Sequence, residues 1–353
     1  MTTTRNLEPL PQQESVKDYY GRVLQANSDL RTSACCTSES LPHRIRAIVQ
    51  QIHPEVLEKF YGCGSPIPPA LDGMTVLDLG AGSGRDCFIL SRLVGANGRV
   101  IGVDMTPAQV AVARHHVEYH TREFGYPRPN VVFHEGYIED LAAIGIRDSS
   151  VDVVVSNCVL NLSPDKPGVF REIFRVLKPG GELYFSDVFA DRRVPPPLAA
   201  DPVLLGECLG GALYLEDFRR LLGKVGCLDH RVVARSPIAL RDQEIERKVG
   251  GIRFESVTIR AFKLPLEDRC EEYGQVAYYQ GTIPECPHLF SLDDHHHFRT
   301  GQPMLVCGNS AAMVNETRYA PHFRVVGDTS HHFGLFDCAP GAAASNGASG
   351  SCC

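Results

Sequence analysis

The chain has 353 residues, enough for about two domains with a sizeable core. Its 35 Lys and Arg residues stand against 42 Asp and Glu residues, a net charge of -7 without a concentrated basic stripe, which argues against a nucleic-acid partner. The amino terminus MTTTRNLEPLPQQES lacks the apolar segment of a signal peptide, and the longest apolar runs fall far short of the roughly 20 residues that span a bilayer. We therefore predict a soluble, cytoplasmic protein with no membrane partner.

Residues 1–70 predict a helical amino-terminal arm. Ile45, Ile48, Val49 and Ile52 recur at helical spacing, as expected for helices that pack against a neighbouring domain. The arm also contains the polar loop TSACCTSES, which carries two adjacent cysteines.

Residues 71–229 alternate short β-rich runs with longer amphipathic stretches. We predict strands at 75–80, 99–104, 131–136, 151–157 and 182–188, with helices in RDCFILSRLV, PAQVAVARHHVEYHTREF and KPGVFREIFRVL. Several of these strands are almost entirely apolar, as strands buried on both faces should be. The pattern predicts an α/β fold with a Rossmann-like, doubly wound and mainly parallel sheet.

The pattern changes after residue 230, where short β-like pieces are separated by charged and histidine-rich loops. This predicts a smaller carboxy-terminal α+β domain at 230–338. Its DHHH run, residues 294–297, is more typical of a solvated loop than of a metal site. Residues 339–353 are rich in Gly, Ala and Ser and predict a flexible tail.

A glycine turn follows the first predicted strand. TVLDLG continues into AGSGRD, so that Asp78, Gly80, Gly82 and Gly84 form a D-x-G-x-G-x-G pattern at the start of a helix. Glycines allow a tight turn and close approach of a ligand to the backbone. An ordinary structural turn could use the same pattern.

An acid at the end of the second strand favours a ligand-binding turn over an ordinary structural turn. Asp104 follows the last glycine by 20 residues, the position at which a doubly wound nucleotide site places a carboxylate for ribose hydroxyls. A dinucleotide-binding oxidoreductase would also contain both the glycine turn and an acid at this position.

Thirteen cysteines are many for this length, and an odd count without a secretion signal argues against a fully paired disulfide framework. We expect reduced thiols, some buried as small apolar residues and others reactive or bound to a soft ion. Cys158 lies where a buried strand ends, the edge at which open α/β sheets bind ligands. Cys63 and Cys208 have glycine neighbours that permit close approach of a ligand.

Several motifs that contain or neighbour these residues resemble those of one class of proteins. The glycine turn, the KPGG segment before ELYFSDV and the strand end EGYIED together resemble class I methyltransferases that use S-adenosylmethionine. The resemblance implies that Asp78 and the segment from Gly80 to Gly84 lie along the methionine part of this methyl donor and that Asp104 bonds its ribose. Met105, Ile138 and Glu139 would flank the adenine, although core packing also explains the first two.

Longer segments resemble one family within that class. SNCVLNLSPDKPGVFREIFRVLKPGGELYFSDVFADRRVP, GECLGGALYLEDF, VLDLGAGSGRDC, GVDMT and FYGCG look like the arsenite methyltransferase family. The resemblance implies transfer of methyl groups to thiol-bound trivalent arsenic, giving mono- and dimethylated arsenicals. Arsenite or its thiol conjugates would be the substrate, and glutathione or the thioredoxin system would supply reducing equivalents.

The family resemblance also implies roles for single residues. Cys158 and Cys208 would hold arsenic throughout, Cys63 would complete the early site, and Cys35 would join in substrate capture or in a disulfide. Tyr61 and Asn157 would lie near the sulfonium group of the methyl donor.

The sequence departs from the family pattern at two positions. Cys36 adds a thiol beside Cys35, and Leu215 stands where relatives usually carry tryptophan. Two other functions remain as alternatives, namely a class I methyltransferase for an organic small molecule and a non-catalytic, thiol-based arsenic-binding protein.

The cysteines outside the predicted site have other expected roles. We hypothesise that the vicinal Cys352 and Cys353 capture arsenite. The remaining cysteines are expected to be structural: Cys87, Cys227, Cys270, Cys286, Cys307 and Cys338.

Overall fold

The computed structural model describes residue 13 and residues 43–60 and 66–338. Our predictions for Cys35, Cys36, Tyr61 and Cys63, and those for the tail with Cys352 and Cys353, lie outside these residues. Within the described ranges, no helix has the length and apolar character required to cross a bilayer.

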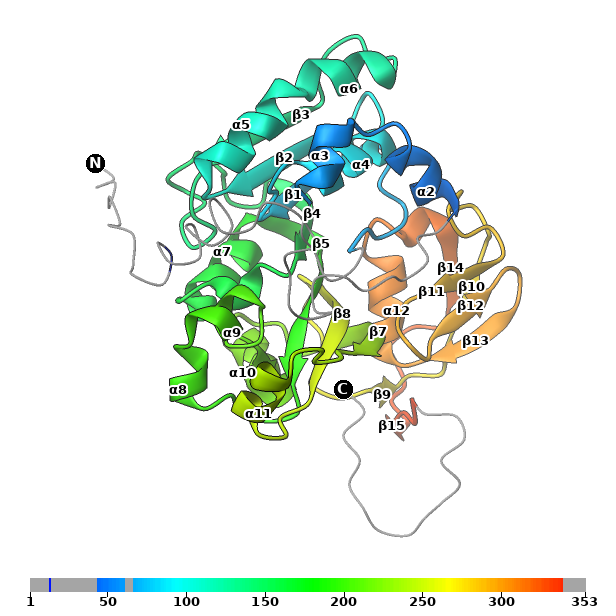
Figure 1. Cartoon of the computed structure of the whole chain (residues 1–353). Coiled ribbons are helices and arrows are strands. Elements are labelled where there is room, and N and C mark those ends of the chain that lie inside the picture. Colours follow the sequence, from blue (N-terminus) through cyan, green and yellow to red (C-terminus); the bar gives the residue numbers. More distant parts are fainter. Residues whose placement is uncertain (1–12, 14–42, 61–65, 339–353) are drawn as a thin grey trace, which may run out of the picture.

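A twisted central sheet organises the chain (Figure 1). Its strands are β1 (Thr75–Leu79), β2 (Arg99–Asp104), β3 (Val131–Glu135), β4 (Val151–Asn157), β5 (Leu177–Ala190), β7 (His230–Pro237) and β8 (Phe254–Phe262), with the short β6 (Leu213–Tyr214) beside β5. Their order is β3-β2-β1-β4-β5-β8-β7. The pairs from β3 to β5 are parallel, whereas β8 runs antiparallel to both β5 and β7. The predicted doubly wound α/β fold is confirmed.

Helices cover both faces of the sheet. Those of the central region are α4 (Arg85–Val94), α5 (Pro107–His115), α6 (Val117–Glu123), α7 (Lys166–Val176) and α10 (Leu215–Lys224). Val76 packs on one face with α2 (His43–Val49), α4 and α5, and its neighbour Leu77 packs on the other with α7 and α10. Alternating residues of buried parallel strands therefore feed two separate cores.

The shorter helices lie around this framework. They are α3 (Pro54–Glu58), the 3-10 turn η3 (Leu160–Leu162), α8 (Pro196–Ala199), α9 (Pro202–Gly206) and α11 (Gln243–Val249).

Two predicted pieces of the carboxy-terminal domain belong to the central sheet instead. RVVARS and SVTIRAFKL form most of β7 and β8, so the sheet continues past residue 229, the boundary that the sequence pattern had suggested. These antiparallel strands do not follow a strand–helix alternation, which is why the pattern separated them from the parallel part. The division of the chain into domains stays a prediction.

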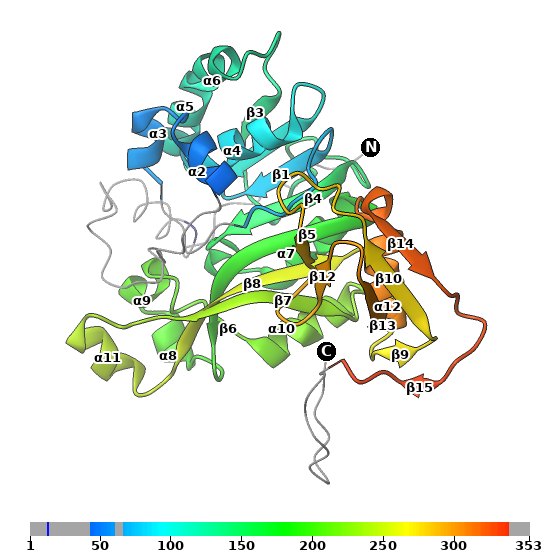
Figure 2. The ribbon, with the colours of Figure 1, turned by 90° about the vertical axis from the view of Figure 1, so that its right-hand side faces the viewer.

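Small sheets complete the carboxy-terminal region. They are formed by β9 (Glu271–Glu272), β10 (Gln275–Tyr279), β11 (Leu289–Ser291), β12 (His297–Arg299), β13 (Pro303–Val306), β14 (Phe323–Val326) and β15 (Gly334–Leu335), with α12 (Gly308–Asn315) and the 3-10 turn η4 (Ala320–His322). The pairings are β13-β10-β14, β11-β12 and β15-β9. Figures 1 and 2 show this region on the opposite side of the molecule from α8 and α9.

A buried ionic cluster ties the small sheets to the central sheet. Glu182 on β5 is fully buried and pairs with Arg260 on β8 and with Arg318, which precedes η4. The Tyr319 hydroxyl donates to the same carboxylate at 3.1 Å. One carboxylate therefore joins β5 to β8 and to the segment just before η4.

A second network surrounds the predicted histidine loop. Arg231 on β7 contacts Asp229 at 2.6 Å and Asp293 at 3.1 Å, and all three residues are buried. His296 contacts Asp293 at 2.8 Å. Part of the DHHH loop is thus packed into an ion-pair network rather than being fully solvated as we expected.

The Glu182 cluster leads to a stability prediction. The change Glu182→Gln leaves two buried guanidinium groups without their carboxylate, so the free energy of unfolding should fall by about 3–5 kcal/mol. Urea denaturation followed by circular dichroism measures this. The matched control is Glu216→Gln, which breaks an exposed 3.0 Å pair with Arg219 and should cost only about 0.2–1 kcal/mol. If the free energy of unfolding fell equally in the two variants, the Glu182 cluster would not be a stronger source of stability than an exposed ion pair.

Candidate active site

The predicted glycine turn joins β1 to α4 and requires glycine at two positions. Gly80 and Gly84 have φ angles of +80° and +93°, which disfavour other residues. A Cβ atom at Gly80 would lie 2.2 Å from the Val159 side chain, and one at Gly84 would lie 2.8 Å from Phe133. Gly82, at φ +51°, has no atom within 4 Å of its hypothetical Cβ. The turn is packed tightly on one side and open on the other.

Asp104 fixes the open part of this turn. Its carboxylate accepts hydrogen bonds from the Gly82 N–H at 2.9 Å and from the Thr106 N–H at 2.8 Å. Burial raises the pKa of Asp104, and these two backbone donors oppose that rise. A carboxylate has about four acceptor positions, so capacity remains for a ligand hydroxyl.

An open cleft lies over the turn, with about 1030 Å³ of empty volume including open solvent. It is lined by nine of the predicted site residues, namely Asp78, Gly80, Gly82, Asp104, Met105, Ile138, Glu139, Asn157 and Cys158. Gly84 lies behind the turn against Phe133 and does not line the cleft. The lining of the cleft combines apolar side chains with a few polar groups, as the sites of small-molecule ligands do.

Two aspartates give the floor of the cleft an acidic character. Burial and the nearby charge of Asp86 raise the pKa of Asp78 to about 8. Asp86 itself accepts from Asn157 Nδ2 at 3.1 Å and from Arg85 at 3.2 Å. Buried carboxyl groups gathered in this way favour a positively charged ligand, since a cation would relieve their mutual repulsion.

Glu139 is held on the far wall of the cleft. Its carboxylate accepts from Ser163 Oγ at 2.6 Å and from Gln13 Nε2 at 3.2 Å. Gln13, which comes from the predicted amino-terminal arm, lines the cleft. The arm therefore contributes at least one residue to this wall.

The two predicted thiols in the described residues come together beside the cleft. Cys158 and Cys208 have φ angles of +57° and +61°, left-handed values that are uncommon for residues other than glycine. The Cys208 thiol donates to the Cys158 carbonyl at 3.5 Å. Both side chains are buried, and Cys208 does not itself line the cleft. Two such strained residues in contact suggest a functional constraint.

Polar contacts beneath the thiols bring their loops together. Asn161 donates its backbone N–H and its side-chain amide to Asp187 at 3.1 and 2.8 Å. Gly211, in the loop of Cys208, lies so close that a Cβ atom would be 2.0 Å from the Asn161 carbonyl oxygen. Burial raises the pKa of Asp187 to about 6. This network positions the β4 loop against the loop that follows α9.

The oxidation states of the two cysteines differ. Cys158 is disulfide-bonded, which departs from our expectation of reduced thiols, whereas Cys208 carries a thiol. Cys158 is thus a redox-active candidate as well as a ligand candidate.

Sequence reasoning missed several residues of the cleft wall. These are Gln13, Lys59, Phe60, Asp86, Thr106, Gln109, Gly136, Tyr137, Val159, Leu162 and Ser163. The sequence could have indicated Asp86, because it is an acid in the first helical turn after the glycine loop. Gln13 had none, because its place on the wall depends on tertiary packing.

The strand order, the glycine turn and the acid at the end of β2 define a class I methyltransferase. Residues 70–226 match the family model described as "Methyltransferase domain". The chain is 55% identical to the arsenite methyltransferase of Aquipseudomonas alcaligenes over 92% of this chain and 93% of that one. It is 43% identical to the human arsenite methyltransferase over 89% and 83% of the two chains. The chain belongs to the arsenite methyltransferase family.

A solved structure agrees with this assignment. An arsenic(III) S-adenosylmethionine methyltransferase from Chlamydomonas reinhardtii superposes with a TM-score of 0.82 and 53% identity, covering 84% of this chain and all of the other.

Asp78 should make the stability of the ligand-free protein depend on pH. Its carboxyl has a pKa of about 8 in the folded chain, against an ordinary aspartate value of 3.8. The folded state therefore binds the proton more tightly, and the free energy of unfolding should fall as pH rises from about 4 to about 8. Asp78→Asn should remove this part of the pH dependence and stabilise the ligand-free chain at the alkaline end of the range.

Urea denaturation across this pH range measures the effect as the difference between variant and unchanged protein. Asp268→Asn, at an exposed aspartate, serves as the control and should give a constant difference. A pH-independent difference for Asp78→Asn would show that its carboxyl is ionised throughout.

Proposed function

We propose that this chain transfers methyl groups from S-adenosylmethionine to thiol-bound trivalent arsenic, giving mono- and dimethylated arsenicals. The observation that carries the proposal is the contact between Cys158 and Cys208 beside the acidic cleft. Membership of the arsenite methyltransferase family supports it. We further propose that the reaction takes place in the cytoplasm.

The cleft has the features that the methyl donor needs. S-adenosylmethionine supplies a methyl group on a cationic sulfur, which is a good leaving group. Asp78 and Asp86 offer negative charge to its ammonium and sulfonium groups, and Gly82 leaves the turn open to it. The remaining acceptor capacity of Asp104 suits the ribose hydroxyls.

The other predicted donor-binding residues keep their proposed roles. Met105, Ile138 and Glu139 line the cleft and would flank the adenine, and Asn157, paired with Asp86, would lie on the side of the sulfonium. Ile138 also packs into the core, so its apolar face serves both functions. Tyr61 is proposed to lie near the sulfonium.

Arsenic would be held by thiolates beside the methyl group. Cys158 and Cys208 are the proposed permanent ligands, Cys63 would complete the early site, and Cys35 would capture substrate or join in a disulfide. Three thiolates suit trivalent arsenic because it is soft, and they leave its lone pair free. The protein's main contribution is to hold arsenic and methyl carbon at near-attack distance.

Methyl transfer to arsenic is a two-electron oxidation of the arsenic atom, so a reduction must follow it. The arsenic lone pair would form the new As–C bond, and the electron pair of the broken C–S bond would stay on the departing sulfur. Arsenic would become formally pentavalent, and two thiolates would return it to the trivalent state by supplying two electrons and forming a disulfide. No general base is required, because trivalent arsenic in a thiolate complex carries no proton to remove.

The disulfide at Cys158 fits an oxidised resting state that is reached after the arsenical has left the site. In that state Cys158 cannot bind arsenic, so each cycle requires reduction of the disulfide. We propose that glutathione or thioredoxin supplies the reducing equivalents and that arsenite enters as such or as its thiol conjugate.

The activity can be tested with labelled S-adenosylmethionine, arsenite and a thiol reductant. We expect label in methyl- and dimethylarsenicals separated by chromatography, and none when arsenite is omitted. Label only on an organic acceptor would support a different methyltransferase substrate. Arsenite binding without labelled product would support a non-catalytic arsenic-binding protein.

The two thiols can be tested separately from the methyl donor. Cys158→Ser and Cys208→Ser should each abolish arsenic methylation and lower arsenite affinity by about tenfold or more, because each removes an As–S bond. S-adenosylmethionine binding, measured by calorimetry, should persist in both variants. Cys286→Ser is the matched control, since Cys286 is a half-buried cysteine away from the cleft. Full methylation in either site variant would exclude that cysteine as an essential ligand.

A further inference from the structure

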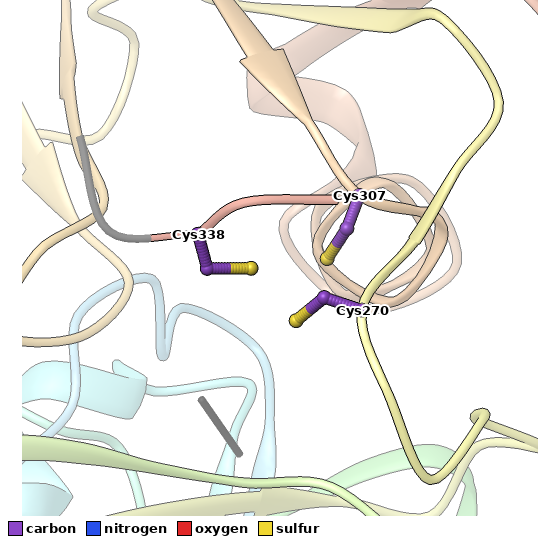
Figure 3. Close-up of side chains that lie close together, drawn as sticks. All are labelled: Cys270, Cys307 and Cys338. Atoms are coloured by element: carbon purple, nitrogen blue, oxygen red, sulfur yellow. The ribbon is translucent and has the colours of Figure 1, made fainter. Parts of the chain in front are cut away.

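Three cysteines from distant parts of the carboxy-terminal region meet in one cluster. The Sγ atoms of Cys270, Cys307 and Cys338 all lie within 4.8 Å of one another. Figure 3 shows the three side chains turned toward a common centre. We expected these cysteines to be separate structural residues, and none of them lines the cleft.

Secondary structure brings these side chains together. The antiparallel pairing of β9 with β15 aligns Glu271 with Leu335, and the Phe336 N–H donates to the Cys270 carbonyl at 2.8 Å. Cys270 and Cys338 therefore flank the same two-stranded ribbon. Cys307 comes from a third segment, between β13 and α12, where it caps the helix by accepting the Ser310 N–H at 3.4 Å.

The surroundings of the cluster differ from those of buried cysteines that act as small apolar residues. Its members are only 4%, 0% and 3% exposed, yet among the described hydrophobic residues they form a separate group, with Phe336 as the one partly buried hydrophobic side chain packed against it. By contrast, Cys87 and Cys227 are part of the two large cores of the central sheet. Three buried sulfur atoms facing one another are better explained by a shared ligand than by apolar packing.

The electrostatic environment favours thiolate at this position. The Arg231 guanidinium reaches Cys307 Sγ at 3.9 Å, and the Ser310 N–H at the start of α12 points to the same sulfur. A nearby cation and a helix amino terminus both stabilise a thiolate. Arg231 also pairs with Asp229 and Asp293, which hold it in place.

The number of ligands narrows the choice of ion. Among the described residues, no histidine, aspartate or glutamate joins the three sulfur atoms as a fourth ligand. Structural zinc takes four protein ligands in a tetrahedral arrangement. A soft trivalent ion that forms three bonds and keeps a lone pair fits a set of three thiolates more closely.

We propose that Cys270, Cys307 and Cys338 form a second binding site for trivalent arsenic, separate from the methyl-transfer cleft. The choice of arsenic as the ligand rests on the proposed function. Binding is a condensation in which three thiols react with arsenous acid, three As–S bonds form and three water molecules leave. The oxidation state of arsenic does not change, so no oxidant or reductant takes part. The bound arsenic would cross-link three chain segments.

The test isolates this site from the other thiols. In a background chain, Cys35, Cys36, Cys63, Cys158, Cys208, Cys352 and Cys353 are all replaced by serine. After incubation with arsenite under reducing conditions and removal of unbound arsenite, elemental mass spectrometry should find about one arsenic per chain. X-ray absorption should find about three sulfur neighbours around it. The melting temperature should rise with arsenite concentration, because the ligand binds the folded chain.

Adding Cys307→Ser to this background should lower bound arsenic about tenfold or more, because one As–S bond is lost. Serine is also a good helix cap, so the start of α12 should persist. Adding Cys286→Ser instead should leave the arsenic content unchanged. Circular dichroism and S-adenosylmethionine binding confirm that each variant is folded.

Four results would overturn the proposal. The first two are a folded background chain that binds no arsenic and bound arsenic that remains after Cys307→Ser. The other two are zinc held at the cluster that arsenite does not displace and a disulfide within the cluster that resists reduction. Because the readout is binding in a chain without the proposed active-site thiols, it is independent of methyl transfer. Arsenic bound here in a protein that methylates no arsenic would refute the proposed function alone.

Discussion

The candidate site depends on how the chain leaves the carboxyl ends of β1 and β4. At this edge the backbone must turn sharply while its polar groups remain bonded. The Gly80 N–H donates to the Val103 carbonyl at 2.8 Å, and the Cys158 N–H donates to the Ser186 carbonyl at 2.8 Å. Both residues adopt positive φ angles. Glycine tolerates this conformation, but cysteine does so at a cost of about 1–2 kcal/mol. Retaining cysteine there implies that its sulfur is needed.

The electrostatics of the cleft follow from the same edge. Asp78 comes from β1 and Asp104 from the end of β2, and burial raises the pKa of both carboxyl groups. A fold selected for stability alone would gain by replacing Asp78 with a neutral residue. The arrangement makes sense for a cationic ligand, which would stabilise the ionised form and release a proton on binding. The strained Cys158 and the acidic floor thus belong to a single cleft, and the strained Cys208 lies beside it.

Sulfur gathers at two places, and each depends on contacts between segments far apart in sequence. Beside the cleft, the Asn161–Asp187 contact and the close approach of Gly211 bring Cys208 to Cys158. In the carboxy-terminal region, the β9–β15 ribbon brings Cys270 and Cys338 to Cys307. The buried ionic clusters centred on Glu182 and Arg231 anchor this second region to β5, β8 and β7.

The sequence by itself determined the parallel part of the sheet, and it singled out several residues that the structure places on one cleft. Helix α4 has the predicted residues Arg85–Val94, and Asp78, Gly82 and Asp104 line the cleft, while their role in binding the methyl donor stays a prediction. Such features are readable because local periodicity and turn chemistry specify them within a few residues. Only the tertiary structure decided that β7 and β8 extend the sheet, that Gln13 reaches Glu139, and that three carboxy-terminal cysteines meet. Those outcomes rest on strand pairing and packing between distant segments, which no local pattern encodes.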